Sequence, residues 1–207
     1  MSSAKRPPRT RLDAEQRREQ ILQAAARIIG QRGYNGFGIQ ELARDCGITN
    51  AGLLHYFGTK ERLLIGVLED RDRRDAVAVT SIAGLTGRRD THIGLSLKQI
   101  LKVLRAIVQR NSTQPEFVRL YTVLRAEALN QGHPAQQYFV AREAATLDAF
   151  ARMVAPHVAT PRSTARQLLA FMCGLQEQWL RADHDFNLVT EWDRGVALLL
   201  PQREPME

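Results

Sequence analysis

The segment from Gly33 to Leu64 constrains the fold more than any other, because two short helical patterns meet there at a glycine. Upstream of Gly47, apolar residues recur at helical spacing, namely Ile39, Leu42, Ala43 and Cys46. Gly47 can adopt the left-handed conformation that ends a helix. Thr49 is a suitable N-cap for the next helix, in which Leu53 and Phe57 point back to the core. The segment therefore predicts a helix-turn-helix, whose second helix fits the major groove of DNA.

The sequence on either side of this segment also predicts helices. Asp13 and Gln16 form a possible capping box for a first helix, which Gly33 closes. Its apolar stripe consists of Ile21, Ala25, Ile28 and Ile29. Thr59 caps a longer helix that buries Leu63, Leu64, Val67 and Leu68 and then carries a highly charged surface over residues 69–75. We expect this longer helix to link the DNA-binding unit to the rest of the protein.

The residues of the helix-turn-helix also carry a family resemblance. Residues 48–61 read ITNAGLLHYFGTKE, preceded by Gly33-Tyr34 and by Glu41-Leu42-Ala43. Over residues 15–68 the chain resembles the TetR family of transcriptional regulators. It departs from the family pattern at Phe37 and Gly38, where Ser or Thr is frequent, and at Leu54, where an aromatic is frequent.

The remaining sequence contains only helical patterns, without a useful period-2 strand pattern, so the predicted fold is all-α with about nine helices. We expect residues 13–60 to form the DNA-binding domain and residues 61–207 the effector-binding and dimerisation domain. Residues 1–12 form a predicted disordered basic arm, which fits either minor-groove contact or a solubilising tail.

Charge and composition agree with a DNA-binding protein. The net charge is +7, and residues 1–62 hold 11 Lys and Arg against 6 Asp and Glu. Alone, this excess would fit a basic tail equally well; beside the helix-turn-helix it favours DNA. Val196–Leu200 is the longest apolar run, far short of the ~20 residues that a membrane span needs. With two distant cysteines and no apolar segment after the N-terminal basic residues, the expected location is cytoplasmic.

The helix after Thr49 supplies the candidate DNA contacts. Asn50 and His55 are polar candidates for base edges, while Ala51, Gly52 and Leu54 suit thymine methyl groups. Tyr56 and Lys60 are phosphate candidates, which the resemblance supports, although Tyr56 could instead be a core aromatic. The full predicted set is Gln40, Thr49, Asn50, Ala51, Gly52, Leu54, His55, Tyr56 and Lys60.

The sequence offers no catalytic constellation. The five histidines are scattered, and HExxH, CxxC, GxSxG and phosphate-binding glycine motifs are missing, so we expect no enzyme activity, metal or cofactor. Arg125 beside Glu127, and Arg142 beside Glu143, are typical of solvated helix charges. Cys46 and Cys173 are typical of small core residues.

The C-terminal half is expected to hold an effector site and a dimer interface. The resemblance implies both, without saying which residues form the pocket. Suitable pocket-lining residues, each of which could equally be plain core, are Phe117, Tyr121, Phe139, Phe171, Met172, Gln176 and Trp179. The candidate dimer residues on the last two helices are Trp179, Leu180, Trp192, Val196 and Leu199.

Together these features predict a homodimeric, ligand-responsive transcriptional regulator, a repressor that leaves a palindromic operator when an unidentified small-molecule effector binds. Two alternatives stay open. One is an all-helical enzyme with an incidental helix-turn-helix. The other is an architectural DNA-binding protein without an effector.

Overall fold

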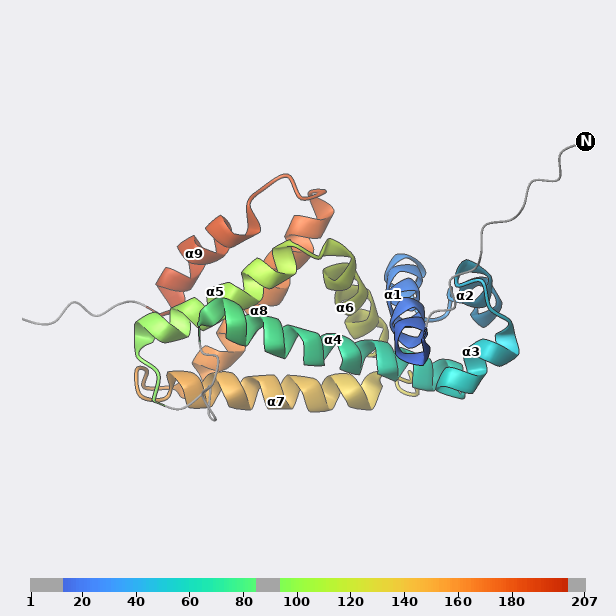
Figure 1. Cartoon of the computed structure of the whole chain (residues 1–207). Helices are drawn as coiled ribbons and strands as arrows, with labels where there is room; N and C mark the ends of the chain where they lie inside the picture. The colour runs from blue at the N-terminus through green and yellow to red at the C-terminus, as the bar shows by residue number, and fades with distance from the viewer. Residues whose placement is uncertain (1–12, 85–93, 201–207) are drawn as a thin grey trace, which may run out of the picture.

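The computed structural model describes residues 13–84 and 94–200, and these form nine helices and no strand (Figure 1). The helices are α1 (Ala14–Arg32), α2 (Ile39–Asp45), α3 (Asn50–Phe57), α4 (Lys60–Ala83), α5 (Leu97–Ser112), α6 (Pro115–Glu127), α7 (Gln136–Val154), α8 (Pro161–Arg181) and α9 (Leu188–Leu199). The predicted all-α class and helix number are confirmed for these residues. In the same ranges no helix is long and apolar enough to cross a membrane.

The molecule is elongated, with a small three-helix unit at one end and a larger bundle at the other (Figure 1). Helices α1, α2 and α3 make up the small unit, and α3 lies close to the tip of the molecule. Helix α4 starts beside α3 and runs into the bundle, where it packs against α5. The prediction that α4 extends from the small unit into the rest of the protein is therefore confirmed.

Local sequence signals set most helix ends. Asp13 and Gln16 form the predicted capping box at α1, and Gly33 ends this helix with φ of 71°. The hydroxyl of Thr59 accepts a hydrogen bond from the backbone N–H of Arg62 and caps α4. Pro115 and Pro161 occupy the first turns of α6 and α8, where a missing N–H costs nothing. The predicted basic arm (1–12) lies outside the described residues.

Two hydrophobic cores stabilise the fold, and their boundary differs from the predicted one. The first core joins α1, α2, α3 and the first half of α4 through Leu68, and it also takes in Leu120 and Leu124 of α6. The second core lies among α5, α7, α8 and α9. A division at residue 60 therefore cuts through continuous packing, because α4 and α6 contribute side chains to the core of the small unit.

Candidate nucleic-acid interface and internal cavity

The turn between α2 and α3 has the geometry that the sequence predicts. Gly47 has φ of 65°, in the left-handed region, and reverses the chain after α2. The Thr49 hydroxyl accepts a hydrogen bond from the backbone N–H of Gly52 at 3.0 Å, which caps α3. Leu53 and Phe57 point into the core, so the opposite side of α3 faces outward. The cap and the two buried side chains therefore orient α3 so that one of its faces is turned to the outside.

That face contains most of the predicted DNA-binding residues. The exposed members are Gln40, Thr49, Asn50, Ala51, Leu54, His55 and Tyr56, while Gly52 and Lys60 are partly buried. Tyr56 retains 36% of its surface, so it is not a core aromatic. Leu54 and Tyr56 are large side chains left partly exposed on this helix, at 38% and 36% of their surface.

Lys60 lies in an aromatic setting that the sequence pattern did not suggest. Its Nζ lies 4.3 Å from the ring centre of Tyr34 and 5.2 Å from that of Phe37. The Tyr34 hydroxyl donates to Glu61 Oε1 at 2.8 Å, and burial, together with this hydrogen bond, raises the pKa of Tyr34. Phe37, one of the departures from the family pattern, is buried and supports the lysine through its ring face. The ammonium group is thus held at the first turn of α4, beside α3.

Ion pairs and one side chain–backbone bond fix α2 on α1. Arg17 Nη1 donates to the carbonyl oxygen of Cys46 at 3.2 Å, and Cys46 itself is buried, as predicted. Further along α1 there are two ion pairs, Arg27 with Asp45 at 2.6 Å and Arg32 with Glu41 at 2.8 Å. Since α1 also packs against α4 and α6, the orientation of the helix-turn-helix depends on the larger bundle.

The junction between α6 and the small unit contains a specific polar contact. Glu127, at the end of α6, accepts a hydrogen bond from the backbone N–H of Tyr34 at 2.9 Å. Gly33 makes this approach possible, because a Cβ at that position would overlap the Glu127 carboxylate. His133 lies edge-on to Tyr34, with ring centres 5.4 Å apart. The turn that carries Tyr34, and through it Lys60, is therefore attached to α6.

A cavity of about 500 Å³ lies within the bundle, lined by α4, α5, α6, α7 and α8. Five of the seven predicted lining residues surround it, namely Phe117, Tyr121, Phe139, Met172 and Gln176. Phe171 and Trp179 do not line it. Phe171 stacks on Trp192 with ring centres 5.3 Å apart, and Trp179, about two turns after Met172 on α8, packs against His184.

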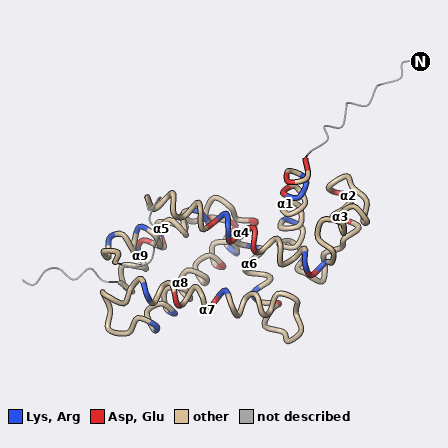
Figure 2. Tube along the Cα trace, turned by 60° about the horizontal axis from the view of Figure 1, so that its bottom comes forward, with Lys and Arg blue, Asp and Glu red and all other residues tan. Residues whose placement is uncertain are grey.

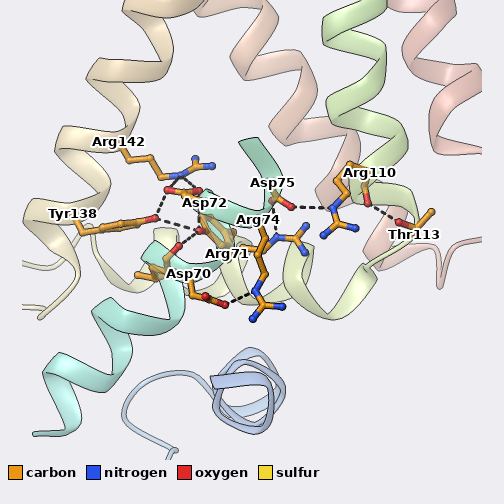
Figure 3. A network of polar contacts seen from close by, with 11 residues as sticks. Asp70, Arg71, Asp72, Arg74, Asp75, Arg110, Thr113, Tyr138 and Arg142 are labelled. Carbon is orange, nitrogen blue, oxygen red and sulfur yellow. Dashed lines mark hydrogen bonds and ion pairs between the residues drawn. The ribbon is translucent and has the colours of Figure 1, made fainter. Parts of the chain in front are cut away.

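Asp72 is the centre of a polar network on the wall of this cavity (Figure 3). Its two carboxylate oxygens each lie 3.0 Å from Nε of Arg142, and the Tyr138 hydroxyl donates to Oδ2. The Tyr121 hydroxyl oxygen lies 3.0 Å from Asp72 Oδ1 and 2.9 Å from the Leu68 carbonyl oxygen. Burial is the main reason why the pKa values of Tyr121 and Tyr138 are raised, so both hydroxyls remain protonated donors.

Asp75 forms the second polar group of the cavity, one helical turn further along α4. Arg71 Nε lies 2.6 Å from Asp75 Oδ2, and Arg110 Nε of α5 lies 3.1 Å from Oδ1 (Figure 3). Burial raises the pKa of Asp75 and lowers that of Arg71, while their mutual attraction opposes both shifts. The Arg71 guanidinium also covers the ring of Phe117 at 4.3 Å. Only 4% of the Arg71 side chain is exposed, so its charge depends on Asp75.

The expectation of a highly charged surface over residues 69–75 holds for the exposed Glu69 and Arg73 but is wrong for Arg71, Asp72 and Asp75. Figure 2 shows the basic and acidic residues side by side along the middle of the helix. Arg71, Asp72 and Asp75 point into the bundle, and Arg142 and Arg125 line the cavity rather than standing in bulk solvent. A sequence signal did exist, since Leu64, Leu68, Asp72, Asp75 and Val79 continue one helical stripe.

Three of the predicted dimer residues are buried within the single chain. Trp192 is completely buried, and Trp179 and Val196 each retain 5% of their surface. Their side chains fill the second core, so they leave no surface for another subunit, and their assignment to an interface is corrected. Leu180 and Leu199 are partly exposed. Leu198 of α9, which the sequence pattern did not single out, is 84% exposed.

The histidines and cysteines are not gathered into a metal site in the described ranges. No group of three or more His, Cys, Asp or Glu side chains there could hold an ion. His157 Nε2 lies 2.9 Å from the Leu95 carbonyl oxygen, in a contact with the backbone. Cys173 is only partly buried and touches Arg125 at the cavity wall, which differs from the core position expected for it.

Comparison with known proteins finds a family match in the N-terminal part of the chain. Residues 21–67 match the family model described as bacterial regulatory proteins, tetR family. The HTH-type transcriptional regulator BetI of Rhizobium meliloti is 30% identical over 115 residues, which cover 54% of this chain and 52% of that protein. The HTH-type transcriptional repressor NicS of Pseudomonas putida is 28% identical over 128 residues, covering 60% and 54%. The chain thus spans about half the length of these relatives.

Solved structures with the same fold cover nearly the whole chain. FadR from Bacillus subtilis in complex with stearoyl-CoA superposes with a TM-score of 0.70, at 14% identity over 88% of this chain and 97% of that one. NalD, the secondary repressor of the MexAB-OprM multidrug efflux pump in Pseudomonas aeruginosa, gives a TM-score of 0.67, at 21% identity over 91% and 95%. At such identities the likeness establishes the fold alone.

Proposed function

We propose that this chain, whose residues 21–67 match the family model of TetR-type bacterial regulatory proteins, is a DNA-binding transcriptional repressor controlled by a small-molecule effector. The observation that carries this proposal is the outward face of α3, which lies close to the tip of the molecule and is left exposed within the described chain. The protein would act in the cytoplasm, where the DNA is located.

The proposed DNA contacts follow from the position of each side chain. Asn50 and His55 stand on the exposed face of α3, where an amide or imidazole can reach base edges. Ala51, Gly52 and Leu54 are small or apolar and suit thymine methyl groups. Of the remaining residues, Gln40, Thr49 and Lys60 lie at the amide ends of α2, α3 and α4, where phosphates can bind, and the exposed Tyr56 lies near the end of α3 as a further phosphate candidate.

The functional division of the chain is proposed at residue 60, although the packing is continuous there. Residues 13–60 carry the DNA-binding face, and residues 61–207 carry the cavity and the surface that pairs two subunits. A two-fold pair would place two α3 helices in successive major grooves, about 34–36 Å apart, on a palindromic operator.

The proposed switch uses the two elements that join cavity and helix-turn-helix. Helix α4 begins beside α3 and carries cavity residues at Arg71 and Asp72, while α6 carries Arg125 in the cavity and Glu127 on the backbone of Tyr34. An effector that binds better to one arrangement of α4 and α6 shifts the population towards it. The separation of the two α3 helices then changes, and contacts to both half-sites are lost.

Retrieval of genomic DNA fragments from the encoding organism tests this function. The immobilised full-length protein is expected to enrich a few fragments that share an inverted repeat. An N50A/H55A double variant, which changes only exposed α3 side chains, is expected to lose this enrichment. Retrieval of all fragments to the same extent would favour the architectural alternative. No retrieval of DNA at low salt would contradict DNA binding altogether.

A further inference from the structure

We propose that the internal cavity takes an amphipathic carboxylate, with the anion held by Arg125 of α6 and Gln176 of α8. This inference deepens the proposed function and rests on it only in treating the cavity as the effector site.

Arg125 is the cationic lining residue that lacks a carboxylate partner among the described residues. Arg71 is paired with Asp75, and Arg142 with Asp72, whereas Arg125 Nη1 donates to the sulfur of Cys173. A guanidinium has five N–H donors, and a thiol is a weak acceptor. Arg125 is therefore under-satisfied in the place where it faces the cavity.

Gln176 supplies a second donor beside this guanidinium. Its Nε2 is buried and has no hydrogen-bond partner among the described residues, although a buried amide normally finds one. Gln176 lies three residues after Cys173 on α8, so both side chains stand on the same face of the helix. Since Arg125 contacts Cys173, the guanidinium and the amide converge on one region of the cavity wall.

A carboxylate satisfies both groups, while a cation does not. Arg–carboxylate pairs form two parallel charge-assisted hydrogen bonds, and each carboxylate oxygen can accept a further bond. The acidic residues of the wall, Asp72 and Asp75, are already occupied by tyrosine hydroxyls and by the arginines of three helices. A cationic ligand would have to displace these internal donors.

The far end of the cavity is apolar and suits the body of such a ligand. On α4 the lining changes from Arg71, Asp72 and Asp75 to Ala76, Val79, Thr80 and Ala83, and the Thr80 hydroxyl donates to the Ala76 carbonyl oxygen of its own helix. The lining positions from Arg71 to Ala83 span about 18 Å at 1.5 Å per residue. A cavity of about 500 Å³ is in the range of small-molecule sites. The shape therefore favours one charged end and an extended hydrocarbon tail.

Calorimetric titration of the full-length protein with three ten-carbon probes tests the inference without DNA. Decanoate carries the carboxylate, decanol keeps the tail without charge, and decyltrimethylammonium reverses the charge. We expect decanoate to bind the wild-type protein at least about tenfold more tightly than either other probe, as one charge-assisted contact predicts. Equal or tighter binding of decanol or of the ammonium probe, or no saturable decanoate binding at millimolar concentration, would overturn the proposal.

Variants locate the anion within the cavity. R125Q is expected to weaken decanoate binding by about tenfold or more while leaving decanol affinity unchanged, and R125K should restore part of the loss. R119Q changes an exposed arginine of the same helix and serves as the matched control. An R125Q variant that folds, as judged by its unfolding temperature, and still binds decanoate like wild type would refute the assignment.

The outcomes separate the ligand class from the proposed function. Decanoate that binds through Arg125 without affecting DNA retrieval would support the anion site and contradict effector control. If the protein retrieves specific DNA but does not bind decanoate, the proposed repressor function would stand and the proposed carboxylate ligand would be rejected.

Discussion

At the scale of single residues, Lys60 connects the proposed DNA-binding face with the aromatic residues that pack beneath it. Lys60 is the first residue of α4, and its ammonium group lies over the rings of Tyr34 and Phe37. The rings restrict the side chain without neutralising it, so the charge remains available to a phosphate. This arrangement gives Phe37 a role at a position where the family more often has a hydroxyl residue.

We expect Lys60→Ala to weaken binding to all DNA sequences about equally. A phosphate contact carries no base information, and its loss should reduce the slope of log affinity against log salt by roughly 1. Fluorescence anisotropy with a labelled duplex at several salt concentrations measures both quantities. Lys98→Ala, on the exposed side of α5, is the control and should leave the slope unchanged. Wild-type affinity of K60A at low salt would remove Lys60 from the interface.

At the scale of elements, the attachment of α6 to the turn after α1 depends on one glycine. Gly33 has φ of 71° and ψ of 176°, a conformation that essentially only glycine adopts, and it leaves room for Glu127 to reach the backbone N–H of Tyr34. Helix α6 thereby contacts both the cavity and the DNA-binding unit.

Gly33→Ala is therefore expected to lower the free energy of unfolding by about 1–3 kcal/mol, from backbone strain and displacement of Glu127. Gly66→Ala is the matched control, because its Cβ would meet Phe57 and Leu22 at ordinary distances of 3.7–3.8 Å within a helix. That change should stabilise the protein by about 0.5–1 kcal/mol. Urea denaturation measures both, and equal effects of the two changes would contradict the strain argument.

The buried pair on α4 gives a second prediction at this scale. Asp75→Asn leaves the Arg71 guanidinium, which is 4% exposed, without its carboxylate and should cost about 3–5 kcal/mol. Asp148→Asn breaks an ion pair with Arg162 in which both side chains are about half exposed, and should cost only about 0–1 kcal/mol. Thermal unfolding of the two variants at one concentration distinguishes them. A similar small effect for both would show that Arg71 is solvated.

The elements themselves were largely predictable, whereas the polar wall of the cavity was not. Capping residues and apolar spacing are local signals, and they placed α1, α2, α3 and the start of α4 correctly. The partners of Asp72 come from Tyr121 and Arg142, 49 and 70 residues away, and no local pattern specifies such contacts. For the same reason Trp192 was assigned to an interface, although Phe171 of α8 covers it within the chain.

At the scale of the whole molecule, the proposed function requires two subunits. The last two helices remain the proposed pairing surface, and Leu198 is a large apolar side chain on them that is 84% exposed. Because Trp179, Trp192 and Val196 already serve the core, pairing has to use the outer faces of α8 and α9. An operator bound by two α3 helices then depends on residues far from the DNA.

We expect Leu198→Glu to convert a wild-type dimer into monomers, because pairing would bury an unpartnered charge. Light scattering at micromolar concentration measures the mass directly. Leu129→Glu, at an equally exposed position after α6, should leave the mass unchanged. A wild-type monomer, or an L198E protein that stays dimeric, would place the pairing surface elsewhere.

The most direct test of the central claim is a binding selection from randomised duplex DNA with the full-length protein. We expect an inverted repeat whose half-sites are separated by about one helical turn, and Asn50→Ala should relax the preference at one position in each half. Enrichment of no sequence, or an unchanged motif for α3 variants at both Asn50 and His55, would contradict sequence reading by the outward face of α3.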